Sequence, residues 1–198
     1  MLSWFLKRRL DAFERSFDYD MRYAREIAAI SPKALLMYFR ATDLGNYKKG
    51  IPLDAWFAAR LVTTAFEDCG PCTQLGVTMA VRAGVDPHVV ERIIAGDFDA
   101  LPSHVALTAR FVVAALERSP EADELRDRVE ALFGRHGLLS IVFGMTACRL
   151  YPTLKYALGH GKTCQRVFVD GKAVSRGGIF AERAQPMPLA PPLAGAVS

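Results

Sequence analysis

Two cysteines three positions apart, Cys69 and Cys72, are the residues of this sequence best suited to chemistry. They enclose Gly70-Pro71, and the pattern that follows predicts a helix starting at this motif. Two thiols at this spacing can close a small disulfide, and the positive end of a helix dipole stabilises a thiolate. The motif therefore predicts thiol–disulfide chemistry at neutral pH.

Two simpler interpretations of the cysteine pair stay open, namely two structural thiols spaced by chance and a zinc site. Zinc needs two further ligands, and no second paired spacing exists among the other cysteines and histidines, which are Cys148, Cys164, His88, His104, His136 and His160. We expect Cys148 and Cys164 to be buried or incidental thiols and the histidines to lie at the surface or at helix ends. We therefore expect no metal and no cofactor.

Apolar residues recur at three- and four-residue spacing through most of the chain, which predicts an all-α fold. Ser31-Pro32 is typical of a helix start, and Gly84 and Gly96 are typical of helix ends. We expect Pro152 to kink the last helix. The predicted helices span about 1–17, 19–30, 32–40, 52–66, 72–83, 87–95, 102–118, 120–133 and 138–158.

The chain divides into three predicted parts. Residues 1–50 form an N-terminal helical extension, because three short helices bury little by themselves. Residues 51–165 form the helical domain that carries the cysteine pair. Residues 166–198 hold a short hairpin around Asp170-Gly171, followed by a flexible proline-rich tail.

Charge and hydropathy exclude several functions. The 25 Lys and Arg exceed the 21 Asp and Glu by 4, but the excess lies in the two ends of the chain, and residues 51–151 carry a net charge of −4. No basic run exceeds Lys7-Arg8-Arg9, so nucleic-acid binding is not expected. The longest apolar block, residues 138–148, is too short to span a bilayer, and no secretory signal is evident. We expect a cytoplasmic protein.

The letters Cys-Gly-Pro-Cys are also those of thioredoxin, whose motif follows a buried strand in an alternating strand and helix fold. The apolar segment 61–66 allows such a strand before the motif. After Cys72, however, only helical patterns follow until Val167, so the sequence offers no βαβ core.

From about Ile51 to His160 the sequence resembles the alkylhydroperoxidase D-like, or carboxymuconolactone decarboxylase, family. The resemblance rests on a helix that leads into Cys-x-x-Cys, on a helix ending in Arg82-Ala83-Gly84-Val85-Asp86 and on a helix ending in Ala95-Gly96-Asp97. It implies an all-α homo-oligomer, a trimer or a multiple of one. It also implies reduction of a hydroperoxide through the two cysteines, with Cys72 attacking and Cys69 resolving. A lipoyl or thioredoxin-type protein would then be the electron donor.

Two positions depart from the family's pattern, since the relay His and Glu of the peroxidase branch are here Gly76 and Phe57. A glycine inside a helix indicates that a helix, ligand or subunit approaches closely. Glu67 is our candidate replacement as proton acceptor, although Glu67 and Asp68 are better explained as helix-start charges; Asp54 is a further candidate. The alternative is a redox-inactive oligomer that binds a small apolar ligand or partner, or catalyses a non-redox reaction, in a pocket widened by Gly76.

Two surface features complete the predictions. Gln74, Thr78 and Arg82 form a polar stripe, which is more typical of a solvated or subunit-facing surface than of a pocket lining. Trp4 and Phe5 beside Lys7-Arg8-Arg9 would suit a membrane-surface anchor. We favour packing on the core or on a sister subunit, because acidic residues follow closely on the same segment and anionic lipid would repel them.

Overall fold

The computed structural model of the chain describes residues 2–161, 166–177 and 180, which form eight α-helices, two 3-10 turns and one β-hairpin. The predicted all-α fold with a short C-terminal hairpin is confirmed. The bounds are α1 (Leu2–Phe17), α2 (Arg22–Ile30), α3 (Pro32–Thr42), η1 (Asp43–Asn46), α4 (Leu53–Phe66), α5 (Gly70–Arg82), α6 (Pro87–Ala95), η2 (Phe98–Ala100), α7 (Ser103–Glu117), α8 (Ala122–Ala157), β1 (Arg166–Val169) and β2 (Lys172–Ser175).

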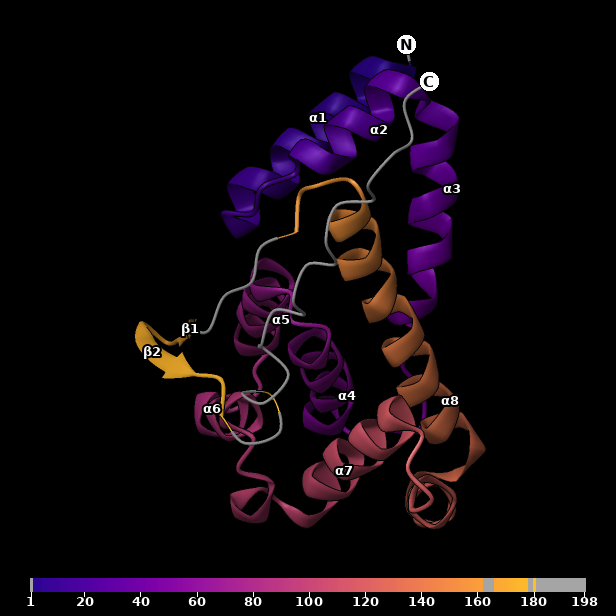
Figure 1. Ribbon diagram of the computed structural model, residues 1–198, viewed down its shortest axis with the longest axis vertical. Coiled ribbons are helices and arrows are strands. Elements are labelled where there is room, and N and C mark those ends of the chain that lie inside the picture. Colours follow the sequence, from indigo (N-terminus) through magenta and orange to yellow (C-terminus); the bar gives the residue numbers. More distant parts are fainter. Residues whose placement is uncertain (1, 162–165, 178–179, 181–198) are drawn as a thin grey trace, which may run out of the picture.

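Helix α4 lies at the centre of the larger hydrophobic core, in contact with α5, α7 and α8 (Figure 1). Its sequence is apolar on most faces, and side chains such as Leu61 and Val62 are fully buried. Because the cysteine pair directly follows the last turn of α4, the best-packed helix of the protein positions the motif.

Helices α1 to α3 lie across one end of the molecule (Figure 1) and have a small hydrophobic cluster of their own. Leu6 and Leu10 of α1 pack in this cluster with Leu35 of α3. Leu75 of α5 and Leu154 of α8 pack against the same cluster and join the extension to the rest of the protein.

The predicted helix boundaries have the expected local causes. The Ser31 hydroxyl accepts a hydrogen bond from the Ala34 amide at 3.2 Å and caps α3. The Asp86 carboxylate does the same for α6, accepting from the His88 amide at 2.8 Å. Gly96 ends α6 with φ of 71°, a left-handed conformation that glycine adopts at little cost.

Helix α8 contains the last two predicted helices of the chain. The predicted helices 120–133 and 138–158 are confirmed as two helical segments of α8, separated by a kink at Gly134, where φ is 66° and ψ is 177°. Pro152 lies inside the second segment of α8 with helical backbone angles, and the kink expected there stays a prediction. Gly134 breaks the helix because it lacks a Cβ and can adopt angles that other residues avoid.

By length and composition α8 could cross a membrane, since an 18-residue stretch has a mean hydropathy of 1.3. This evidence is weak, because core helices of soluble proteins pass the same test, and 33% of the stretch is buried inside the protein. The helix packs along α4 and α7.

The hairpin forms as predicted, with Val167 opposite Val174 in an antiparallel register. Its turn residues, Asp170 and Gly171, both have positive φ, of 47° and 75°, as a tight two-residue hairpin turn requires. Strand β1 packs against α5 and α6. The predicted proline-rich tail, from residue 181 onward, and Cys164 lie outside the described residues.

Candidate functional site

Cys69 and Cys72 form a disulfide at the start of α5. Cys69 is the residue that precedes the helix, and Cys72 lies in its first turn, so the predicted helix start is confirmed. Cys69 is fully buried, whereas 6% of Cys72 is exposed. Both residues are buried, and Cys72 is the one that keeps some exposed surface.

The two carboxylates before the motif are both ion-paired with arginines from distant parts of the chain. The Glu67 carboxylate lies 2.6 Å from Nε of Arg149 on α8. The Asp68 carboxylate pairs with the guanidinium of Arg176, the residue after β2. These arginines offset the negative charge that would otherwise disfavour a thiolate at the neighbouring cysteines.

Arg176 holds the backbone before the motif as well as the Asp68 carboxylate. Its Nη1 donates a hydrogen bond to the carbonyl oxygen of Ala65 at 3.1 Å, and only 2% of its side chain is exposed. Arg176 was not predicted as a site residue, because no local sequence pattern distinguishes an arginine that follows a hairpin. A contact across 108 residues becomes visible only in the fold.

Tyr156 of α8 makes a second contact with the same segment. Its hydroxyl donates a hydrogen bond to the carbonyl oxygen of Asp68 at 2.8 Å. Burial and then the Asp68 carboxylate raise the pKa of Tyr156, so the hydroxyl remains a donor at neutral pH. Asp68 itself has φ of 53°, a left-handed conformation that a non-glycine residue seldom adopts without such support.

The two positions of the missing relay are apolar and filled. Phe57 is buried, with its ring 4.8 Å from the ring of Trp56. A Cβ on Gly76 would lie 3.0 Å from Cδ2 of Leu61, a fully buried side chain of α4. The close approach expected at Gly76 is therefore made by a neighbouring helix, and Leu61 occupies the space where we expected a widened pocket.

Asp54 does not belong to the cysteine site. It lies in the first turn of α4, and Glu67 follows the last, so about 20 Å of helix separates them. Its carboxylate instead lies 2.9 Å from Nε2 of His104 at the start of α7. Of the three carboxylates proposed from the sequence, only Glu67 and Asp68 are brought to the cysteines.

The polar stripe on α5 is partly solvated, as predicted, with Arg82 exposed and Gln74 and Thr78 half-buried, and it also contacts other parts of the same chain. The Gln74 side-chain amide exchanges two hydrogen bonds with the backbone of Phe168, at 2.9 and 2.7 Å. Arg82 donates to the carbonyl oxygen of Ser16 at 2.6 Å and covers the ring of Phe17. Gln74 therefore contacts the hairpin at one end of α5, and Arg82 contacts α1 at the other end.

The remaining candidate ligands stay apart. Cys148 is buried as predicted, and burial raises the pKa of its thiol, which makes it a poor nucleophile. His136 pairs with the Tyr47 hydroxyl at 2.7 Å, and His160 pairs with Glu26 at 2.6 Å. Within the described ranges, no group of three or more Cys, His, Asp or Glu residues is arranged to hold a metal ion.

Two open pockets lie away from the disulfide. One of about 210 Å³ is lined by Leu53, Asp54, Gly84, Val85, Asp86 and Val89. The other, of about 330 Å³, lies between η2, α7 and α8. Neither includes Gly76 or a cysteine, so neither corresponds to the ligand pocket expected beside the motif.

Comparison of the chain with known protein families, with curated proteins and with solved structures gave no match in any of the three. Functional inference therefore rests on the cysteine pair and its surroundings.

Proposed function

We propose that this protein is a thiol-dependent peroxide or disulfide reductase that cycles a disulfide between Cys69 and Cys72, as the alkylhydroperoxidase D-like resemblance implies. The observation that carries the proposal is the position of the pair at the start of α5, with both sulfurs in bonding contact. Helix N-termini stabilise thiolates, and two cysteines at this spacing exchange electrons as a unit.

The exposure of the two cysteines supports separate roles. Cys72 retains 6% of its surface and is the attacking residue, whereas Cys69 is fully buried and resolves. The Cys72 thiolate attacks one oxygen of a hydroperoxide, the O–O bond breaks, and the alkoxide leaves as an alcohol after taking a proton. The Cys69 thiolate then attacks the resulting sulfenic acid, and the disulfide forms as hydroxide leaves and is protonated to water.

The return half of the cycle needs two electrons from a dithiol donor, of the lipoyl or thioredoxin type. One donor thiolate attacks Sγ of Cys72 and displaces the Cys69 thiolate, which leaves a mixed disulfide between the donor and Cys72. The second donor thiolate then attacks the donor sulfur of this mixed disulfide, releases the Cys72 thiolate and closes the donor disulfide. We place this chemistry in the cytoplasm, on a homo-oligomer that is a trimer or a multiple of one. Glu67 is the proposed proton acceptor for this site, paired with Arg149.

Stopped-flow reduction of tert-butyl hydroperoxide by the reduced protein tests this proposal. Cys72→Ser should abolish the reaction, and Cys69→Ser should leave a sulfenic acid that dimedone traps. Cys148→Ser is the matched control, because that buried thiol lies outside the disulfide. A rate unchanged in Cys72→Ser would contradict the proposal.

The apolar relay positions support a second candidate, a redox-inactive helical oligomer. Phe57 and Gly76 supply no proton relay, and Leu61 fills the space beside Gly76. In that case the reduced thiols should resist iodoacetamide at pH 7. The double variant Cys69→Ser with Cys72→Ser should then keep whatever binding or activity the protein has.

A further inference from the structure

The start of α1, the end of α2 and the start of α3 lie at one end of the molecule (Figure 1), and these helices carry large exposed apolar side chains. We call Trp4, Phe5, Ile30 and Met37 the apolar tip; they are 59%, 63%, 78% and 60% exposed. The packing of Trp4 and Phe5 on the core, which the sequence favoured, is not found. Leu6 and Leu10 make that contact instead.

Basic side chains surround the apolar tip. Lys7, Arg8 and Arg9 are exposed on α1, and Lys33 is exposed one helical turn before Met37. Residues 1–10 and 27–40 contain five Lys and Arg and no Asp or Glu. Within the described residues, Lys7, Arg8, Arg9 and Lys33 take part in no ion pair with an acidic side chain.

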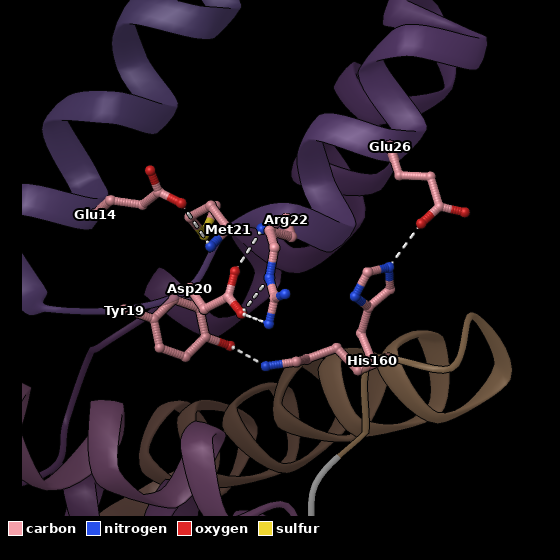
Figure 2. Close-up of polar contacts among 8 residues, drawn as sticks. Glu14, Tyr19, Asp20, Met21, Arg22, Glu26 and His160 are labelled. Atoms are coloured by element: carbon pink, nitrogen blue, oxygen red, sulfur yellow. Dashed lines mark hydrogen bonds and ion pairs between the residues drawn. The ribbon is translucent and has the colours of Figure 1, made fainter.

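Acidic residues on α1 and just before the start of α2 form ion pairs with arginines of α2. Arg25 pairs with both Asp11 and Glu14, the former at 2.6 Å. Asp20 pairs with Arg22 at 2.6 Å, and Glu26 accepts from His160 at 2.6 Å. Figure 2 shows the contacts of Asp20 with Arg22 and of Glu26 with His160, and the Glu14 carboxylate accepting a hydrogen bond from the Met21 amide. Arg22 and Arg25 therefore offset part of the negative charge that would repel anionic lipid.

We propose that the apolar tip binds the surface of an anionic phospholipid bilayer. Trp4, Phe5, Ile30 and Met37 would enter the boundary between headgroups and acyl chains, where aromatic and aliphatic side chains are favoured. The surrounding lysine and arginine side chains would contact headgroup phosphates. This attachment is independent of the cysteine chemistry.

Charge favours a lipid surface over a second copy of the chain. Two tips meeting about a two-fold axis would bring the same basic side chains face to face. Like charges placed together cost free energy, whereas anionic headgroups complement them. The residues of the tip come from three different helices, α1, α2 and α3.

Co-sedimentation of the full chain with vesicles tests the proposal, using phosphatidylcholine alone and equal parts of phosphatidylcholine and phosphatidylglycerol. We expect binding to the anionic vesicles, weakened by salt. Replacing Lys7, Arg8 and Arg9 by Gln should lower the partition coefficient on the order of 100-fold, at about fivefold for each charge. The pair Trp4→Ala with Ile30→Ala should lower it at least about tenfold.

Leu132→Ala and Arg135→Gln on α8 are matched controls, because both side chains are exposed at a distance from the tip, and they should leave binding unchanged. Circular dichroism checks that every variant is folded. Equal binding by the tip variants and the controls would overturn the proposal, as would no binding to anionic vesicles. Tip variants that change the oligomeric mass in light scattering, without vesicle binding, would also overturn it and assign the tip to a second copy.

Discussion

Arg176, directly after the hairpin, forms an ion pair with Asp68, the residue directly before Cys69. The two residues are 108 positions apart, and the arginine side chain is 2% exposed, the aspartate side chain 21%. The contact fixes the last described segment of the chain to the loop between α4 and α5. The local geometry of the disulfide therefore depends on a residue from the other end of the helical domain.

Arg176→Met should destabilise the protein by about 2 to 4 kcal/mol, because it leaves the partly buried Asp68 carboxylate without its partner. Arg149→Met is the matched control on the neighbouring pair with Glu67. The Arg149 side chain is 52% exposed, so its loss should cost under about 1 kcal/mol. Urea unfolding measures the free energy of unfolding of both variants. Equal losses would contradict the greater structural importance of the pair between Arg176 and Asp68.

Gly76→His restores the imidazole of the peroxidase pattern and should destabilise the protein by about 1 to 3 kcal/mol, since even a Cβ there meets Leu61 at 3.0 Å. Leu61→Ala alone should cost about 2 to 5 kcal/mol through the cavity that it leaves. The double variant should lose less stability than the sum of the two single losses, because the imidazole would fill the cavity left by Leu61 and the shorter side chain would remove the clash. Additive losses in a denaturant titration would show that Gly76 and Leu61 are not in contact.

Alkylation of the reduced protein should follow the order Cys72, then Cys69, with Cys148 last. Cys72 keeps some exposed surface and lies in the first turn of α5, whereas burial raises the pKa of Cys148. Timed quenching with iodoacetamide and peptide mass spectrometry give the three rates. Faster labelling of Cys148 than of Cys72 is the outcome that this account does not allow.

Acid should weaken the corner between α1 and α2 through Glu14. The hydrogen bond from Arg25, and then that from the Met21 amide, lower the pKa of Glu14 below its model-compound value of 4.5. A lowered folded pKa contributes stability above pH 4.5, and this stability is lost as the pH falls through the folded pKa. Glu14→Gln should therefore flatten the acid side of a plot of Tm against pH.

Glu124→Gln is the control for the Glu14 experiment, because the Glu124 side chain is 78% exposed and lies 3.9 Å from Arg128. It should keep the acid dependence of the unaltered protein. If Glu14→Gln also keeps the acid dependence of Tm, the stability of the corner between α1 and α2 does not depend on the Glu14 carboxylate.

Local signals in the sequence predicted most of the helices and the hairpin. Ser31, Asp86 and Gly96 act on the backbone within a few residues of themselves, so their effects are visible in the sequence. The break between the two helical segments of α8 falls at Gly134, within the gap predicted between residues 133 and 138. Turn chemistry at Asp170-Gly171 was sufficient to place the hairpin.

The site was predictable only in part. The spacing of Cys69 and Cys72 located it, and the resemblance identified Gly76 as unusual. The arginines that pair with Glu67 and Asp68 come from α8 and from beyond β2, and no local pattern connects them to the motif. Such contacts depend on tertiary packing, which also decided that Trp4 stays exposed while Leu6 is buried.

The paired hydrogen bonds between Gln74 and Phe168 have a consequence for solubility. The side-chain amide of Gln74 has a hydrogen-bond donor and an acceptor, as a peptide group does. Its Nε2 donates to the carbonyl oxygen of Phe168, and its Oε1 accepts from the Phe168 amide. Those groups point away from β2, along the outer edge of a two-stranded ribbon, where a strand from another molecule would otherwise add. The side chain of Gln74 thus acts as a one-residue substitute for a third strand and protects this edge from aggregation.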